Sequence, residues 1–331
     1  MKVWINDPAE GWVVDRLRQE FIANTSLEVV DSVEDCDVIW IYAPWTWYSL
    51  DNYGYWLDTK PVMLTLHHDY NECNKHKIDV LEFLNRNPFV DLYTVYTDKM
   101  VDLVGFLTDH KKEAKRVHHW SNPDLFKVLR MPRDTKQPEH IVVGSFQRDT
   151  EGASIASGEF LPKLEKGPDI FVATLVAMKE EGLNPFARLA GYRRDYVKRE
   201  LDKYKIPYED LGMLDPSELN AAYHTLDYYF VTSRSESGPQ AIFEAALTRT
   251  PILSTDVGCA KEVLSQKCMC FGYDDETTVE AFIEKIKTRE AKHVEALDEN
   301  LGNAKYQSVQ KMVPFFDNLL KQVGGFDEDS N

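Results

Sequence analysis

The sequence predicts an α/β protein built from two doubly wound parallel sheets. Short apolar strand patterns alternate with helical patterns over the first 100 residues, and a second alternating series begins near His140. Such alternation is typical of parallel sheets that helices cover on both faces. Residues 131–140, between the two series, hold two prolines and many charges. We therefore expect a domain junction there.

The first domain is predicted to span residues 1–130. Its strand candidates are short runs rich in β-branched and aromatic residues, at 2–5, 27–30, 37–42, 61–66 and 91–96. Helical patterns separate several of these runs, for example from Val13 to Ala23 and from Asp79 to Asn85. We expect this domain to form the first sheet.

The second domain is predicted to span residues 131–305. Its strand candidates are residues 140–146, 186–191, 226–231, 251–255 and 268–272. A final segment, residues 306–323, has apolar residues at helical spacing, and Pro314 is expected to kink that helix. The tail at 324–331 is expected to be disordered.

Composition restricts the class of protein. The 331 residues carry a net charge of −17, which argues against a protein that binds nucleic acid or anionic membranes non-specifically. Two basic clusters, at 111–116 and 193–199, are expected on solvated helix faces. No apolar run approaches the roughly 20 residues that span a bilayer, and no signal-like leader starts the chain. Five cysteines without C-x-x-C spacing favour a reducing cytoplasm and no structural zinc.

Residues 226–264 are the most informative stretch. A buried strand pattern is followed by a polar loop with Glu236, and then by a helix pattern that holds Glu244. Gly238 and Pro239 favour a tight turn into that helix. The free amides of Gln240 and Ala241 at its start should form an anion site.

The spacing Glu236-x7-Glu244, with Ser237, Gly238 and Pro239 between, resembles the E-x7-E signature of retaining glycosyltransferases of family 4. Residues 245–263 extend the likeness, although Arg249 and Cys259 stand where that family commonly has glycine. The resemblance implies the GT-B architecture of two Rossmann-like domains, with the ligand in a cleft between them. It also implies that Glu236 binds the donor sugar and Glu244 the ribose.

The same resemblance implies a diphosphate site at the start of the second domain. Gly144, Arg148 and Lys166, the last in a Lys-Gly pair, match the residues that bind the donor diphosphate in the family. Here residues 149–165 separate the arginine from the lysine, a longer interval than the family usually has. Met213 and Leu214 match the segment that lines the nucleobase pocket.

The first domain should contribute the acceptor side. His67 and His68 follow a strand pattern, and the resemblance places one of them near the transferred sugar; the sequence does not separate the two. Residues 43–56 hold three tryptophans and three tyrosines, which form either a sugar- or base-stacking platform or a packed loop. In the resembled architecture the final helix crosses back to this domain.

The sequence thus predicts a retaining, metal-independent glycosyltransferase. Its donor is a UDP- or GDP-sugar, it needs no cofactor, and its default acceptor is a hydroxyl of a glycan or lipid-linked saccharide. An Asp-x-Asp pattern at Asp35 and Asp37 precedes a strand, at the wrong end for a ligand. The alternatives are transfer to hydroxylated bases in DNA, a nucleotide-sugar epimerase, and a non-catalytic nucleotide-sugar-binding protein.

Overall fold

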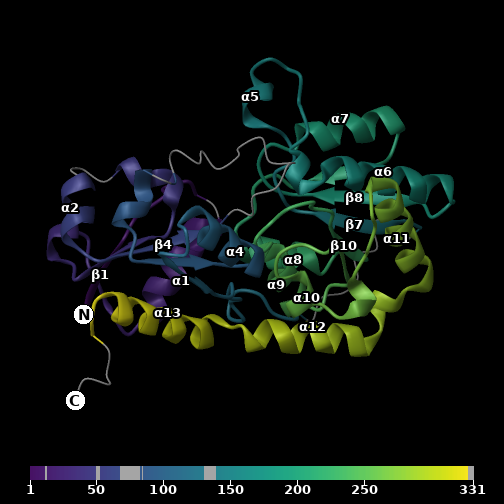
Figure 1. Cartoon of the computed structure of the whole chain (residues 1–331). Helices are drawn as coiled ribbons and strands as arrows, with labels where there is room; N and C mark the ends of the chain where they lie inside the picture. The colour runs from purple at the N-terminus through teal and green to yellow at the C-terminus, as the bar shows by residue number, and fades with distance from the viewer. Residues whose placement is uncertain (12, 50–52, 68–82, 84, 130–138, 327–331) are drawn as a thin grey trace. The chain divides into compact units, whose positions relative to one another are not determined.

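The chain folds into two compact units. The computed structural model describes residues 1–11, 13–49, 53–67, 83, 85–129 and 139–326 (Figure 1). Unit 1 comprises residues 1–120 and 307–331, and unit 2 comprises residues 121–306. Three predicted segments lie largely outside the described residues. They are the junction predicted at 131–140, of which 131–138 are not described, the helix predicted at 79–85, of which only residues 83 and 85 are described, and the tail from residue 327.

Unit 1 contains a six-stranded sheet in the order β2-β1-β3-β4-β5-β6, with every neighbouring pair parallel. The strands are β1 (Lys2–Ile5), β2 (Glu28–Val29), β3 (Val38–Ile41), β4 (Val62–Leu66), β5 (Leu92–Val95) and β6 (Glu113–Arg116). The central strands β3, β4 and β5 are buried at every position, as expected for a parallel sheet with both faces covered.

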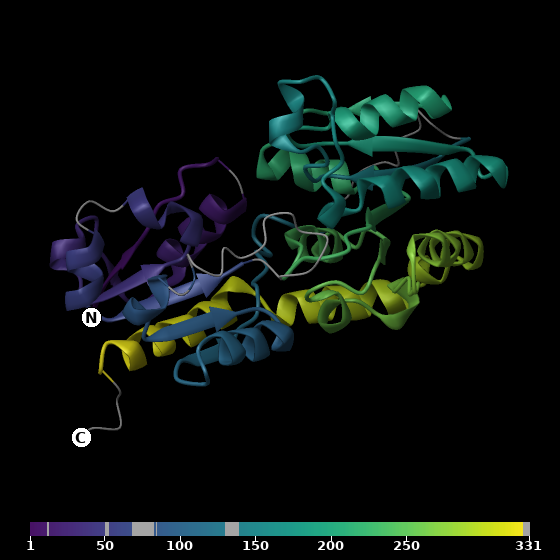
Figure 2. The ribbon, with the colours of Figure 1, turned by 45° about the horizontal axis from the view of Figure 1, so that its top comes forward.

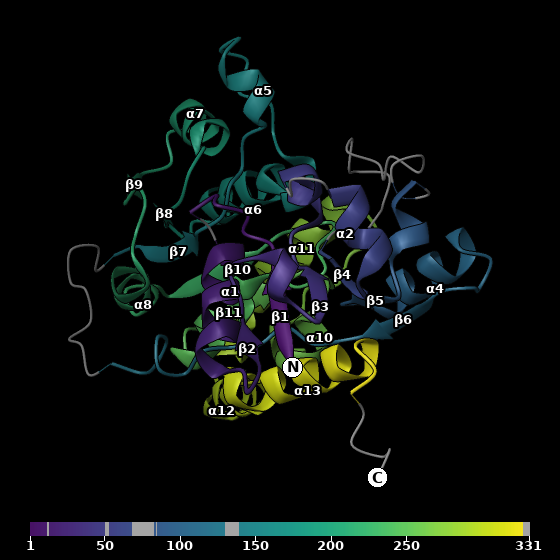
Figure 3. The same cartoon turned by 90° about the vertical axis from the view of Figure 1, so that its left-hand side faces the viewer.

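Helices cover both faces of this sheet. They are α1 (Val13–Asn24), α2 (Tyr53–Thr59), α4 (Asp98–Leu107) and α13 (Val309–Val323), with 3-10 turns at Val33–Asp35, Pro44–Ser49 and Asn87–Phe89. One core joins α1 and α13 to the sheet, and another joins α2 and α4 to its opposite face. The yellow α13 runs along the unit 1 strands in Figure 2 and lies below β1 in Figure 3.

Helix α13 belongs to unit 1 although it follows unit 2 in the sequence. Its carboxylate Asp317, which is buried, accepts hydrogen bonds from the hydroxyls of Thr25 and Ser26 at 2.5 and 2.8 Å. Pro314 lies inside α13, which begins at Val309, and the preceding helix α12 ends at Tyr306.

Unit 2 contains a five-stranded parallel sheet in the order β11-β10-β7-β8-β9. Its strands are β7 (Ile141–Ser145), β8 (Pro185–Leu189), β9 (Tyr208–Asp210), β10 (Tyr228–Val231) and β11 (Ile252–Ser254). Its helices are α5 (Gly152–Ile155), α6 (Pro168–Glu180), α7 (Asp195–Tyr204), α8 (Pro216–Tyr223), α9 (Gln240–Leu247), α10 (Ala260–Val263), α11 (Asp275–Thr288) and α12 (Val294–Tyr306), with 3-10 turns at Leu164–Lys166, Gln266–Cys268 and Glu290–Lys292. Helices α6 and α7 lie on one face, and α8, α9, α10 and α12 lie on the other (Figure 1).

Three strand expectations differ from the structure. The sequence did not indicate β6, whose residues Glu113–Arg116 are mostly charged, because an edge strand pairs on one side only and tolerates polar side chains. The short edge strand β9 was missed for the same reason. The strand expected at 268–272 is wrong: Met269 forms an isolated bridge with Ser254, and the chain then turns away.

Two findings bear on the expected environment of the protein. Among the described residues, no helix combines the length and apolar character that crossing a membrane requires. The four cysteines that the structure describes, Cys36, Cys259, Cys268 and Cys270, are buried free thiols.

Candidate functional site

The carboxyl edge of the unit 2 sheet has a topological switch point. Strands β7 and β10 are neighbours, yet the chain continues from β7 to β8 on one side and from β10 to β11 on the other. The segments that follow β7 and β10 therefore diverge, and open α/β sheets bind ligands where this happens. Lys166 lies in the segment after β7, and Glu236 lies in the loop after β10.

Lys166 and Glu236 meet at this edge. The Nζ of Lys166 lies 2.5 Å from Oε2 of Glu236, and the hydroxyl of Ser233 donates to the other carboxylate oxygen at 2.6 Å. The side chains of Lys166 and Glu236 are 26% and 11% exposed, so both remain accessible from solvent. The structure thus brings together a cation and an acid that are 70 residues apart in the sequence.

Two glycines permit the close backbone approach that forms the edge. Gly167 has φ +60°, and a Cβ built there would lie 1.9 Å from the carbonyl oxygen of Thr232. Gly258 has φ +51°, and its Cβ would lie 2.6 Å from the carbonyl group of Ser237. No side chain fits at either position without movement of the backbone, so the Lys-Gly pair has a steric reason.

Helix α9 carries the second acid of the motif. It begins at Gln240, with Pro239 as the N-cap residue, so the proline precedes the helix instead of lying in its first turn. Glu244 is buried, 6% exposed, and Oε2 accepts a hydrogen bond from the Tyr223 hydroxyl at 2.9 Å. The side-chain amide nitrogen of Gln240 is buried without a hydrogen-bond partner among the described residues. Ser237 is buried, whereas Gly238 and Ala241 are half-buried.

The remaining donor-site candidates lie at several places along the sheet. Gly144 lies inside β7 and not in the loop after it, and the absence of a side chain there leaves room for Leu226. Arg148 is half-buried in the loop that follows β7. Met213 is exposed and Leu214 half-buried beyond β9, at the same carboxyl edge.

Arg194 fixes the loop that holds Arg148. The sequence predicts a solvated helix face at residues 193–199, but Arg194 is buried and pairs with Asp149 at 2.7 Å. Its guanidinium also donates to the carbonyl oxygens of Ser145 and Ala190 at 2.7 and 3.0 Å. The other basic cluster is likewise misplaced, because its residues 115–116 belong to strand β6. Charge counting did not reveal the buried pair, because spacing alone does not give burial.

The insertion at 149–165 forms a projecting segment with α5 near its tip (Figure 1). An antiparallel bridge between Thr150 and Pro162 closes its base. This base is next to the Asp149–Arg194 ion pair. The last residues of the segment lead directly into the 3-10 turn that contains Lys166. The long interval between Arg148 and Lys166 is thus a closed excursion that returns the chain to the same edge.

The carboxyl edge of unit 1 has a different character. His67 follows β4, its Nε2 lies 2.6 Å from the carbonyl oxygen of Tyr42, and its ring packs near Tyr96 and His119. Tyr96 and His119 stack with ring centroids 3.6 Å apart. Burial, assisted by the nearby His67, lowers the pKa of His119 well below its usual value, because the charged ring would lose its hydration. His68 lies outside the described residues.

The aromatic stretch at 43–56 is only partly described. Trp45 is exposed, and its ring centroid lies 5.7 Å from that of His67. The side chains at 47–53 lie outside the part of the chain that the structure describes. Trp45 therefore places one exposed indole beside the histidine that the sequence selected.

Arg234 is a residue of the edge that no sequence motif indicated, although it lies two residues before Glu236. Its guanidinium pairs with Asp169 at 2.5 Å and with Asp275 at 2.7 Å. The two carboxylates hold the pKa of Arg234 above its usual value despite partial burial. The sequence did contain a signal for Arg234: an arginine in the same loop as the motif residue Glu236 indicates an ion pair with other carboxylates.

Comparison with known proteins agrees with this geometry. Residues 145–308 match the family model described as "Glycosyl transferases group 1". A comparison with curated proteins by sequence found no match. Solved structures do match, with low sequence identity over nearly the whole chain.

Three of these structures are informative. HepE of Anabaena, crystallised with UDP and glucose, has a TM-score of 0.72 and 12% identity over 97% of this chain and 99% of its own. Sucrose-phosphate synthase from Thermosynechococcus elongatus has a TM-score of 0.70 and 13% identity, over 98% of this chain and 99% of its own. A TarM mutant of S. aureus, in complex with Fondaparinux, alpha-GlcNAc-glycerol and UDP, has a TM-score of 0.64 and 11% identity, over 86% of this chain and 55% of its own.

At these identities the likeness concerns the fold, and it confirms the predicted GT-B architecture of two parallel-sheet α/β domains. The family model accounts for the unit that holds Lys166, Glu236 and Glu244. The chain therefore has the GT-B fold, and its residues 145–308 match the glycosyl transferases group 1 model.

Proposed function

We propose that this protein is a retaining, metal-independent glycosyltransferase, which moves a sugar from a nucleoside-diphosphate sugar to an acceptor hydroxyl. One observation carries the proposal: Lys166 and Glu236 meet within 2.5 Å at the switch point of the unit 2 sheet. A cation beside an acid suits a ligand that joins a diphosphate to a hydroxyl-rich sugar. The match of residues 145–308 to the glycosyl transferases group 1 model supports it.

The diphosphate would bind to Lys166, Arg148 and the start of α9. Cleavage of the sugar–phosphate bond leaves extra negative charge on the nucleoside diphosphate, and fixed cations and amides stabilise that charge as it develops. The amides of Gln240 and Ala241 begin α9, where the helix dipole also favours an anion. These groups supply the stabilisation that a divalent metal gives in other enzymes, and so we propose that none is needed.

The two glutamates would bind the hydroxyl-rich parts of the donor. In this proposal Glu236 accepts hydrogen bonds from the sugar and Glu244 from the ribose, with Tyr223 holding Glu244 in place at 2.9 Å. Met213 and Leu214 would lie beside the base. HepE structures hold UDP-glucose or UDP, so a UDP-sugar is the first donor to test.

Retention follows from the proposed proton path. The C1–O bond to phosphate breaks on the same face of the sugar on which the bond to the acceptor oxygen forms. The acceptor proton passes to the leaving phosphate oxygen, so no protein base is required. His67 or His68 would lie on the acceptor side, and we expect the acceptor to be a glycan or lipid-linked saccharide. A reducing cytoplasm suits the buried free thiols.

The test combines donor screening with one matched pair of variants. A thermal-shift screen of UDP- and GDP-sugars finds the donor, because a ligand at 100 times its Kd stabilises a protein by about 2.7 kcal/mol. We then expect Lys166→Ala to lower kcat at least about 100-fold. Lys292→Ala is the control, since Lys292 pairs with Asp227 at 2.9 Å at the opposite, amino edge of the same sheet.

The outcomes separate the proposal from its alternatives. Near-wild-type turnover of Lys166→Ala would refute the role of Lys166. Conversion of the donor without release of nucleoside diphosphate would indicate an epimerase, and binding without release under any acceptor would indicate a sensor. Inversion at C1 in the product, followed by NMR, would refute retention, and loss of activity in EDTA would refute metal independence. If sugar is transferred only to hydroxylated bases in DNA, the acceptor is DNA and not a glycan or lipid-linked saccharide.

A further inference from the structure

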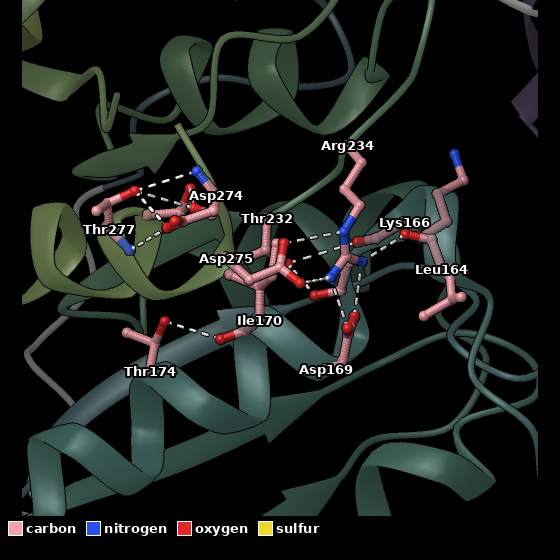
Figure 4. Close-up of polar contacts among 12 residues, drawn as sticks. Leu164, Lys166, Asp169, Ile170, Thr174, Thr232, Arg234, Asp274, Asp275 and Thr277 are labelled. Carbon is pink, nitrogen blue, oxygen red and sulfur yellow. Dashed lines mark hydrogen bonds and ion pairs between the residues drawn. The ribbon is translucent and has the colours of Figure 1, made fainter. Parts of the chain in front are cut away.

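The guanidinium of Arg234 uses all five of its N–H donors. Its nitrogens donate to both carboxylate oxygens of Asp169 at 2.8 and 2.5 Å, and to both of Asp275 at 3.2 and 2.7 Å. A further bond reaches the carbonyl oxygen of Leu164 at 2.8 Å. Figure 4 shows the guanidinium between these acceptors. Because a guanidinium has five donors, none remains for a ligand unless one of these bonds is given up.

The acceptors lie on both sides of the Lys-Gly pair in the chain. Leu164 precedes Lys166 in the same 3-10 turn, and Asp169 follows Gly167 in the first turn of α6. One planar group therefore braces the turn before and after Lys166. A bidentate contact of this kind fixes direction as well as distance.

The third acceptor provides a rigid support. Asp275 is the first residue of α11, next to the N-cap Asp274, whose carboxylate accepts from the amide of Thr277 at 2.8 Å in a capping box. Figure 4 shows this cap beside Asp275. Arg234 is thus fixed to a capped helix end, with a side chain only 16% exposed.

The backbone around Arg234 joins the same turn. The amides of Arg234 and Ser235 donate to the carbonyl oxygen of Glu165 at 2.9 and 3.2 Å, and the hydroxyl of Thr232 donates to that of Gly167 at 2.8 Å. Glu236, two residues further on, then reaches Lys166 at 2.5 Å. The loop 232–236 and the turn 164–169 are therefore held as one rigid pair of segments.

We propose that Arg234 is a positioning residue, which acts through its forks to Asp169 and Asp275 to keep Lys166 and Glu236 in register for the donor. This inference rests on the proposed function. Arg234 acts without touching the donor, because its donors are occupied. Lysine keeps the charge but has neither the planar fork nor enough donors, so it does not replace arginine here.

The test is a double-mutant cycle with UDP as the probe, and with GDP if the wild type prefers it. Kd is measured by calorimetry for the wild type, Arg234→Lys, Lys166→Ala and the double variant. We expect Arg234→Lys to weaken binding about 10-fold in the wild-type background and less than about 2-fold in the Lys166→Ala background, because residues that act as one unit are not additive. A merely structural role would give the same loss in both backgrounds.

Two further variants keep the test decisive. Asp275→Asn replaces Arg234→Lys in the test if Arg234→Lys folds poorly. It leaves the fork to Asp169 intact, so we expect it to weaken nucleotide binding only about threefold. Arg249→Lys is the control, because Arg249 pairs with Asp298 of α12 at 2.7 Å, and we expect no change in Kd. Equal losses in both backgrounds, or no loss in Arg234→Lys, would overturn the inference.

A readout without donor separates this inference from the proposed function. Hydrogen exchange of the amides at 164–167 should become at least about 10-fold faster in Arg234→Lys than in the wild type, and stay unchanged in Arg249→Lys. A wild type that binds neither nucleotide contradicts the proposed function. Unchanged exchange at 164–167 contradicts the bracing by Arg234, whatever the protein binds.

Discussion

The carboxyl edges of the two parallel sheets differ in what holds them together. In unit 2 the edge is ionic: Lys166 faces Glu236, and Arg234 binds two carboxylates. In unit 1 the edge is aromatic: His67 and His119 pack with Tyr42 and Tyr96, and His119 is buried. The two parallel sheets thus differ at their carboxyl edges, with ion pairs in unit 2 and packed aromatic rings in unit 1.

The difference shows how each edge keeps its geometry. Charged forks and close backbone contacts fix the unit 2 edge, so its geometry depends on glycines and on complete pairing of donors with acceptors. Ring stacking fixes the unit 1 edge, where burial lowers the pKa of His119 well below its usual value. We therefore expect steric and hydrogen-bond changes to act strongly on unit 2, and pH to act on unit 1.

The largest effect is expected for Gly167→Ala. Its Cβ would lie 1.9 Å from the carbonyl oxygen of Thr232 at a positive φ, so the turn and the loop must separate. We expect a loss of about 3 kcal/mol in the free energy of unfolding and loss of nucleotide binding. Gly182→Ala is the control, because it shares the positive φ but has nothing within 4 Å, and it should cost about 1 kcal/mol. Equal costs for both would show that the contact with Thr232 is unimportant.

Tyr223→Phe should have the next largest effect. It removes the hydroxyl that donates to buried Glu244 at 2.9 Å, and it deprives a buried carboxylate of one partner. We expect a cost of about 2 kcal/mol, measured by urea unfolding. Tyr204→Phe, with an exposed ring in the same unit, should stay within about 0.5 kcal/mol of the wild type. A neutral Tyr223→Phe would mean that Glu244 does not depend on this bond.

The buried His119 of unit 1 should make the free energy of unfolding depend on pH. Its folded pKa is lowered, so below about pH 6.5 the unfolded chain takes up a proton that the folded chain does not. Stability should therefore fall as pH decreases from 6.5, by up to about 1.4 kcal/mol per pH unit, and be fully present above it. Urea unfolding of the wild type and His119→Gln between pH 5 and 7 measures this contribution. Identical slopes for the two proteins would contradict it.

The smallest effect is expected at Cys259, behind the unit 2 edge. Burial, with a smaller contribution from the charge of Glu236, raises the pKa of its thiol to about 12. Since the thiolate is the reactive form, iodoacetamide at pH 7.5 should leave Cys259 of the native protein unlabelled and label it after unfolding. Peptide mass spectrometry measures this, and rapid labelling of the native protein would show that the edge opens.

Much of the fold could be predicted, because buried strands have a clear signature. The mostly apolar runs of β3, β4 and β10 were predicted from their local sequence pattern. The edge strands β6 and β9 were missed because one-sided pairing imposes little on their residues. At the site, Lys166, Glu236 and Glu244 were selected from spacing and resemblance, and the structure brings Lys166 and Glu236 together. Arg234 and Arg194 were not selected, because their partners lie far away in the sequence.

Local period and turn residues were enough to predict the alternation of strands and helices, and with it the parallel sheets. The sequence also contains the Lys-Gly pair at residues 166–167, which the likeness to the family selected without giving a steric reason. The packing of distant segments places the carbonyl oxygen of Thr232 where a side chain of residue 167 would stand. The same packing occupies all five donors of Arg234 and buries His119 against Tyr96. Contacts between distant segments set these properties, and no local pattern records them.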